Sequence, residues 1–404
     1  MKLGRNVLAL SLIALAANAA VASPTNKYDL NNDGKIDGRD AESLIMMVGN
    51  TGPTGTMPAL PGSMYDLNAD GKHSIADWRS FVAYVTSVGV YPDALFDVSV
   101  QWGQPLAVIF ADKSAIAQAV SAGRFGTYAM RFDLNADGAV NFKDWALFLS
   151  HYQKASPALV LDADGNSVVN GRDLDRLAQM IDARSYDVAL DLNADGLLNA
   201  ADWKVAVQLA SLVSPKSLFD VDGAPSVAQP ILTSTDGRKI ATSLQGLGVG
   251  FPVSIRYDLN GDGTVQLADW AEWNRYATLI HKKPDLVFDI NGDGFVNSSD
   301  LSMINANMGL FPVQIINDVN GDGLVDSKDS AAFSVRLAMG PVQLIPGDVN
   351  RDGCVNAADQ ALVQAAQGAM SSSPLFDPDL DLSPNGYIGP DDLAVVNSNL
   401  GRCR

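Results

Sequence analysis

Glutamate is almost absent from this chain of 404 residues. Of its 46 acidic residues only Glu42 and Glu272 are glutamate, and all the others are aspartate. Glutamate is a good helix former, whereas aspartate disfavours helix interiors and favours loops and helix caps. The deficit therefore argues against a chain of long, charged surface helices. It directs attention to the loops, where a short carboxylate is a good oxygen ligand for a metal ion.

Basic residues and histidine are also scarce. The chain has 28 lysines and arginines and a net charge of −18, which excludes nucleic acid as an expected partner. The three histidines, His73, His151 and His281, are scattered, and no G-x-S-x-G, H-E-x-x-H or glycine-rich phosphate loop is present. We therefore expect no enzyme activity.

Long hydrophobic runs are missing outside the N-terminus, so we expect no membrane span. The N-terminus combines two basic residues, an apolar run from Val7 to Ala17 and an Ala-Val-Ala site that ends at Ala22. This pattern predicts a signal peptide over residues 1–22, because the run is too short for the alternative, a membrane anchor. The mature chain is then expected to be secreted, either extracellular or at the cell surface.

Only two cysteines occur, Cys354 and Cys403. In an exported protein an even pair of cysteines more often bonds than stays reduced. We predict a disulfide between them, and two buried thiols are the alternative.

A twelve-residue pattern recurs about every 30 residues along the chain. Its clearest copy, DINGDGFVNSSD, runs from Asp289 to Asp300, with oxygen side chains at positions 1, 3, 5, 9 and 12. This is the ligand spacing of an EF-hand calcium loop, with aspartate in place of glutamate at position 12. A single copy could be an Asx-rich turn. Ten copies in register are not explained by turn chemistry.

We predict that these loops bind calcium, up to about ten ions, through side chains at positions 1, 3, 5 and 12. Two copies depart from the pattern, because Ser167 replaces the glycine of one loop and Ser383 is a weaker ligand in another. The predicted ligands are Asp29, Asn31, Asp33, Asp37, Asp40, Asp66, Asn68, Asp70, Asp77, Asp133, Asn135, Asp137, Asp144, Asp162, Asp164, Asn166, Asp173, Asp191, Asn193, Asp195, Asp202, Asp258, Asn260, Asp262, Asp269, Asp289, Asn291, Asp293, Asp300, Asp318, Asn320, Asp322, Asp329, Asp348, Asn350, Asp352, Asp359, Asp381, Ser383, Asn385 and Asp392.

A helical pattern follows each loop, as at Trp78, Phe81 and Val85, whereas the chain before each loop looks short and extended, as at 254–257. Four tryptophans directly follow a closing aspartate, and their helical spacing predicts core positions. The fold is therefore expected to be mainly α, built from tandem calcium loop–helix repeats with short β-bridges between paired loops. Two further units, around Asp97 and Asp220, keep the helix and lose the ligand pattern.

The resulting twelve repeats fall into three blocks of four. After the signal peptide, the blocks cover residues 23–161, 162–288 and 289–404. The third repeat is degenerate in the first two blocks, and the third block holds the predicted disulfide. Such blocks could pack as compact units or as an extended array.

The loop-then-helix unit and the strings DVNGDG and DLNADG resemble the dockerin repeat of cellulosome-type proteins. The nearest stretches are NDVNGDGLVDSKD, around Asp318, and GDVNRDGCVNAADQALV, around Asp348. The resemblance implies that two repeats fold as a pair with two calcium ions, bind a cohesin domain and tether a polysaccharide-degrading enzyme to a scaffold. This chain departs from the family in having ten loops and no catalytic module. Positions 10 and 11, which help choose the cohesin in the family, vary from copy to copy.

The sequence therefore favours a secreted, non-enzymatic calcium-binding repeat protein. Its ions would rigidify the array for a structural, adhesive or surface-assembly role. The alternative is a dockerin-type module that docks on a cohesin-like scaffold in extracellular polysaccharide degradation.

Overall fold

A computed structural model describes residues 26–99, 108–123, 129–221, 232, 234–245, 253–280, 285–293, 295–338, 347–349, 354–370, 380–383 and 385–403. The expected signal peptide of residues 1–22 and the predicted ligands Asn350 and Asp352 lie outside these ranges. Within them, no helix has the length and apolar character needed to cross a membrane.

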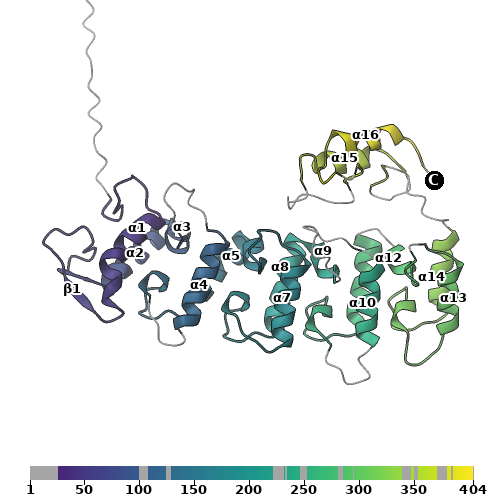
Figure 1. The fold of residues 1–404 in the computed structure, drawn as a ribbon, viewed down its shortest axis with the longest axis horizontal. Helices are drawn as coiled ribbons and strands as arrows, with labels where there is room; N and C mark the ends of the chain where they lie inside the picture. Colours follow the sequence, from purple (N-terminus) through teal and green to yellow (C-terminus); the bar gives the residue numbers. More distant parts are fainter. Residues whose placement is uncertain are drawn as a thin grey trace, which may run out of the picture.

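Helices dominate the structure (Figure 1). The α-helices are α1 (Gly38–Val48), α2 (Ile75–Val88), α3 (Tyr91–Phe96), α4 (Phe110–Gly123), α5 (Phe142–Ala155), α6 (Pro157–Leu161), α7 (Gly171–Asp182), α8 (Ala200–Val213), α9 (Pro215–Phe219), α10 (Ser234–Gln245), α11 (Leu267–Arg275), α12 (Asp285–Phe288), α13 (Ser298–Asn307), α14 (Ser327–Ala338), α15 (Ala357–Ala365) and α16 (Pro390–Asn399). Short 3-10 turns are η1 (Gly49–Thr51), η2 (Met130–Phe132), η3 (Val188–Leu190), η5 (Ile255–Tyr257) and η7 (Ile315–Asn317), and the π-helical segment η6 (Tyr276–Ile280) extends α11. Two strands, β1 (Thr56–Pro58) and β2 (Lys72–Ser74), are present.

Each calcium-type loop ends in a helix that begins at loop position 10. Position 9 is the N-cap, and the aspartate at position 12 is the third helical residue, so the two form a capping box. In the first loop the Asp37 side chain accepts a hydrogen bond from the backbone N–H of Arg39, and the Asp40 side chain accepts one from the backbone N–H of Asp37. The same residues that space the ligands therefore fix the start of the helix.

The expectation of extended chain ahead of each loop is wrong for most of the array. From residue 91 to residue 317, these segments form in alternation the short helices α3, α6, α9 and α12 and the 3-10 turns η2, η3, η5 and η7. Residues 255–257, for example, form η5, with the backbone N–H of Asp258 donating to the carbonyl of Ile255 at 2.9 Å. These one-turn segments bury apolar residues between the longer helices, as Leu95 and Val160 do.

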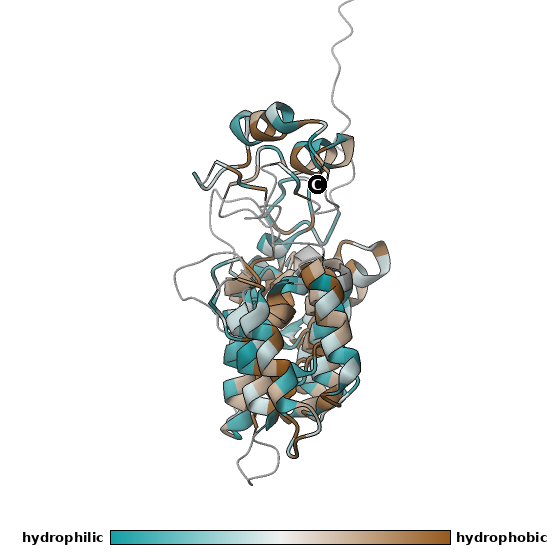
Figure 2. Ribbon diagram, turned by 90° about the vertical axis from the view of Figure 1, so that its right-hand side faces the viewer, coloured by the Kyte–Doolittle hydropathy of each residue, from teal (hydrophilic) through white to brown (hydrophobic). Residues whose placement is uncertain are grey.

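The long helices pack in pairs, and five pairs stack into a row (Figure 1). We call these pairs layers 1 to 5; they contain α1 and α2, α4 and α5, α7 and α8, α10 and α11, and α13 and α14. We number the repeats in chain order, so that layer 1 holds repeats 1 and 2 and layer 5 holds repeats 9 and 10. A single apolar cluster runs through all five layers, from Leu30 to Phe333. In a view along the row, hydrophobic residues lie between two columns of helices (Figure 2).

The last two repeats form a separate pair, α15 and α16, with its own apolar cluster around Val355, Val363 and Val396. Cys354 and Cys403 form a disulfide in this pair, as predicted. We call it the C-terminal pair.

The mainly helical loop–helix fold is confirmed. Its β-type contacts join a loop to the chain that follows the neighbouring helix. In the C-terminal pair, position 8 of each loop bonds to the chain that follows the other repeat's helix. The N–H of Val355 donates to the carbonyl of Arg402 at 2.8 Å, and that of Ile388 donates to the carbonyl of Ala369 at 2.9 Å. In layer 1, strand β1 follows α1 and pairs antiparallel with β2, which is positions 7–9 of the second loop. In these two pairs the partner of position 8 is thus the chain segment that follows the helix of the neighbouring repeat.

Candidate metal centres

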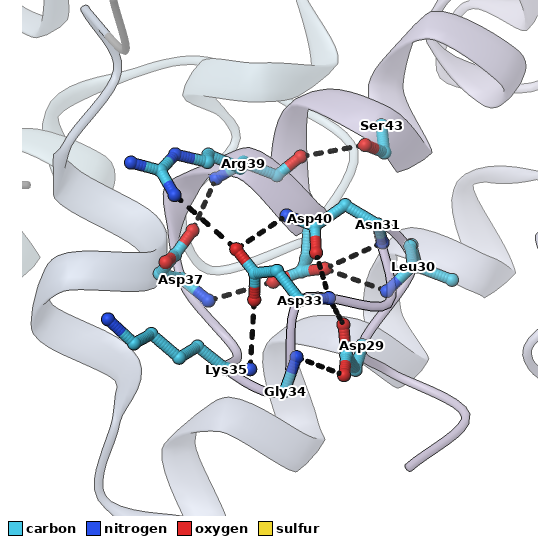
Figure 3. Close-up of polar contacts among 10 residues, drawn as sticks. All are labelled: Asp29, Leu30, Asn31, Asp33, Gly34, Lys35, Asp37, Arg39, Asp40 and Ser43. Carbon is cyan, nitrogen blue, oxygen red and sulfur yellow. Dashed lines mark hydrogen bonds and ion pairs between the residues drawn. The ribbon is translucent and has the colours of Figure 1, made fainter. Parts of the chain in front are cut away.

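In most of the loops that the structure describes, both ends are buried and the middle is more exposed. The closing aspartate at position 12 is buried in all ten loops, and the opening aspartate at position 1 is buried in eight of them. The side chains at positions 3 and 5 lie nearer the solvent, as Asn31 and Asp33 do in the first loop. Figure 3 shows the polar contacts within this loop. An ion could therefore enter from the solvent and meet fixed carboxylates at the base of the loop.

The opening aspartate organises the turn of its loop. In the loop from Asp258 to Asp269, the Oδ2 atom of Asp258 accepts the N–H of Gly263 at 2.8 Å, and its Oδ1 atom accepts the N–H of Asp262 at 3.2 Å. The side chain of Asn260 accepts the same N–H of Asp262 at 2.8 Å. Gly263 has φ of +90°, a conformation that glycine adopts without strain. The corresponding bond from position 6 to the opening carboxylate is present in all eight loops whose position-6 residue the structure describes.

The closing aspartate accepts hydrogen bonds from several backbone N–H groups. Asp269 Oδ1 accepts from Leu259 at 2.8 Å and from Asn260 at 3.3 Å, and Oδ2 accepts from Gln266 at 2.8 Å. The bond from position 9 to the closing carboxylate recurs in all ten loops. A carboxylate has about four lone-pair directions, so three such bonds leave room for a cation.

Burial raises the pKa of several closing carboxyl groups, although the backbone hydrogen bonds oppose the rise. The pKa is raised to about 6 for Asp40, Asp144, Asp173, Asp202 and Asp269. The opening carboxyl of Asp318 is also raised to about 6, again by burial. A carboxylate in such surroundings gains from a nearby positive charge, which a divalent cation in the loop would supply.

Two observations test whether the side chains fit calcium. The Oδ2 atom of Asp37, a predicted ligand at position 9, is buried and has no hydrogen-bond partner among the described residues. In the divergent fifth repeat, oxygen atoms of Asp162, Asp164 and Asp173 lie within 4.8 Å of one another. An all-oxygen set with a free buried carboxylate oxygen suits a hard cation such as Ca²⁺. That the predicted ligands bind calcium stays a prediction.

Basic side chains at position 11 approach three loops. Arg39 lies 3.3 Å from Asp33, Lys143 lies 2.9 Å from Asp137, and Lys328 lies 2.8 Å from Asp322. In each loop the acid is the predicted ligand at position 5. These cations partly neutralise the loop and compete with an incoming ion for that carboxylate.

The two degenerate repeats, 3 and 7, preserve more of the loop than the sequence indicates. Asp112 is fully buried, and its Oδ1 atom accepts the N–H groups of Val98 and Ser99 at 2.8 and 2.7 Å. Asp236 accepts the N–H of Val221 at 2.9 Å. Both therefore occupy the place of a closing aspartate. The sequence signal that could have identified them is an aspartate at the third position of the helix that follows. In these two repeats it lies farther along the chain from the opening Asp97 or Asp220 than in the other loops.

Comparison with known proteins gives one family. Residues 27–84 and 256–309 match the model of the dockerin type I domain, so the chain carries dockerin-like EF-hand-type repeats. Dockerin type I domains bind calcium and dock onto cohesin partners. The first match covers the two repeats of layer 1, whereas the second joins repeat 8 of layer 4 to repeat 9 of layer 5. Searches of curated proteins and of solved structures found no match.

Proposed function

We propose that this protein is an exported, calcium-loaded docking protein of the dockerin type, whose partner is a cohesin-like domain in extracellular polysaccharide degradation. The observation that carries the proposal is the repeated loop, in which buried carboxylates, backbone turns and a helix start are built from one set of residues. The match of residues 27–84 to a protein-binding domain supports it.

In this proposal up to about ten calcium ions would occupy the loops. The opening and closing aspartates would hold each ion, and the position-3 and position-5 side chains would complete the oxygen shell. Because the helix begins inside the loop, an ion that fixes positions 9 and 12 also fixes the first turn of the helix. Docking would then depend on calcium.

Layer 1 is the most suitable place to test docking, because the family match and the structural pair coincide there. Its position-11 residue Arg39 has a partly exposed side chain. The experiment measures binding of the full mature chain to a panel of cohesin domains, with saturating calcium and with chelator. We expect calcium-dependent binding that Arg39→Glu weakens. Arg275→Glu, on the surface of α11, serves as the control.

Failure of every cohesin to bind in saturating calcium would contradict docking of this type. Binding that persists unchanged in chelator would contradict the role of calcium in it.

A second candidate function is a calcium-stiffened rod with a structural, adhesive or surface-assembly role. The apolar cluster that is continuous from Leu30 to Phe333 favours it, because a shared core resists bending between layers. Small-angle scattering with and without calcium tests this role. A calcium-induced rise in rigidity, without any cohesin binding, would select it over docking.

A further inference from the structure

Four tryptophans connect consecutive layers through one kind of hydrogen bond. Each directly follows a closing aspartate and is fully buried. The indole N–H donates to the backbone carbonyl of the aspartate that opens a loop in the next layer. The four bonds run from Trp78 to Asp133 at 2.7 Å, from Trp145 to Asp191 at 2.6 Å, from Trp203 to Asp258 at 2.7 Å and from Trp270 to Asp318 at 2.7 Å.

The peptide unit that receives the indole is also bonded at its other end. The carbonyl of Asp258 accepts from Trp203, and the N–H of the same peptide, on Leu259, donates to Asp269 Oδ1 at 2.8 Å. Asp269 is the closing carboxylate of that loop. A single peptide plane therefore lies between the tryptophan of layer 3 and a predicted calcium ligand of layer 4. Bonds in such a chain polarise and strengthen one another.

Repeats 3, 5 and 7 use a cation in the same place. Lys113, fully buried, donates to the carbonyl of Asp162 at 2.8 Å, and the next N–H, on Ala163, donates to Asp173 at 2.8 Å. In the degenerate repeats, Arg131 donates to the carbonyl of Asp97, and Arg256 to that of Asp220. The following N–H again meets the closing aspartate in both. The arrangement thus recurs in six consecutive repeats, from 3 to 8, irrespective of whether the loop has a full ligand set.

We infer that the four tryptophans are positioning residues that couple calcium binding in each even-numbered loop from repeat 4 to repeat 10 to its contact with the layer before it. The indole fixes the peptide that orients the closing carboxylate, so a loop binds calcium most tightly when it is stacked on the preceding layer. By the same linkage, calcium in the loop strengthens the stacking. This inference rests on the proposed calcium binding and adds the residue that transmits it between layers.

The test replaces Trp203 with phenylalanine, which removes the N–H and keeps an aromatic ring. Calcium is titrated into the full mature chain, and the backbone amide NMR signals of Gly263 and Gly138 are followed. Gly263 reports on the loop that Trp203 contacts, and Gly138 on a loop that it does not contact. Trp273→Phe is the matched control. Trp273 is equally buried, and its indole N–H has no hydrogen-bond partner among the residues that the structure describes.

Loss of one buried hydrogen bond, with the carbonyl left unsatisfied, should weaken calcium binding at the Gly263 loop about tenfold. Binding at the Gly138 loop should stay within about twofold of the wild-type value. Trp273→Phe should change neither loop selectively. Trp145→Phe, read through Gly196, should repeat the result one layer earlier.

Three results would overturn the inference. The Gly263 loop could titrate as in the wild type, both loops could weaken equally, or Trp273→Phe could reproduce the selective loss. If neither glycine responds to calcium in the wild type, calcium binding itself fails, and the inference fails with it.

Discussion

Replacing Arg256 with methionine should destabilise layer 4 whether or not calcium is present. The buried guanidinium donates to the carbonyls of Leu218, Ser217 and Asp220 at 2.8, 2.9 and 2.6 Å. Methionine fills a similar volume and leaves these three carbonyls without that donor. At the lower bound of about 1 kcal/mol for each unsatisfied buried group, the loss is about 3 kcal/mol. The ion pair of Arg256 with Asp175 adds little, because that carboxylate is about one-third exposed.

The assay is urea unfolding followed by far-UV circular dichroism, in saturating calcium and in chelator. Repeat 7 lacks a full ligand set, so the change in the free energy of unfolding should be similar in both conditions. Arg131→Met should behave alike, because Arg131 donates to three carbonyls in repeat 3 in the same way. Arg275→Met, at an exposed pair with Glu272, should change stability by less than about 0.5 kcal/mol. A loss below about 1 kcal/mol for Arg256→Met, or one seen only in chelator, would refute the reasoning.

Three further predictions concern the loops and the C-terminal pair. Burial raises the pKa of closing carboxyl groups such as Asp144 and Asp202 from the usual 3.8 to about 6. In calcium-free protein these groups therefore stabilise the fold fully below pH 3.8, and this stabilisation is lost as the pH rises through 6. The melting temperature in chelator should therefore be higher at pH 5 than at pH 7.5, and calcium should remove this difference; equal melting temperatures in chelator would contradict it. Native mass spectrometry during calcium titration should show stepwise binding of up to about ten ions, and saturation at two would restrict binding to one pair of loops. The double replacement of Cys354 and Cys403 by serine removes a disulfide between residues 49 apart in sequence, so it should lower the free energy of unfolding of the C-terminal pair by about 4 kcal/mol. Hydrogen exchange should rise in α15 and α16 and stay unchanged in layers 1 to 5.

The loop and the helix that follows it were predictable because one short sequence encodes both. Oxygen side chains at fixed spacing need no distant partner to form a turn, and the apolar positions of α2 follow the helical period, so Trp78 and Phe81 are buried as expected. The disulfide was predictable for a different reason, since two cysteines allow only one pairing within the chain.

The stacking of the layers was not predictable from single repeats. The helical pattern indicates that Trp203 is buried, but it does not indicate that its N–H meets a carbonyl 55 residues later. The short helices ahead of the loops were missed because segments such as residues 157–161 are too short to show a period, and their helical form depends on packing between longer helices. The division into three blocks of four repeats stays a prediction about sequence duplication.

The ends of the row show how the array is limited to five layers. In the odd-numbered repeats of layers 2 to 5, the residue two places before the opening aspartate is a buried aliphatic, whereas repeat 1 has the exposed Lys27 in that place. A lysine there would be buried if another layer stacked against it, which is unfavourable without a partner.

At the other end, repeat 10 has Ser330 in the position where repeats 2, 4, 6 and 8 have tryptophan. The indole that would meet the opening carbonyl of a sixth layer is therefore missing. This agrees with the separate apolar cluster of the C-terminal pair, whose two repeats bond to each other through Val355 and Ile388. The residues that stack layers and the residues predicted to bind calcium are thus distinct, and the chain changes the first set at each end while it keeps the second.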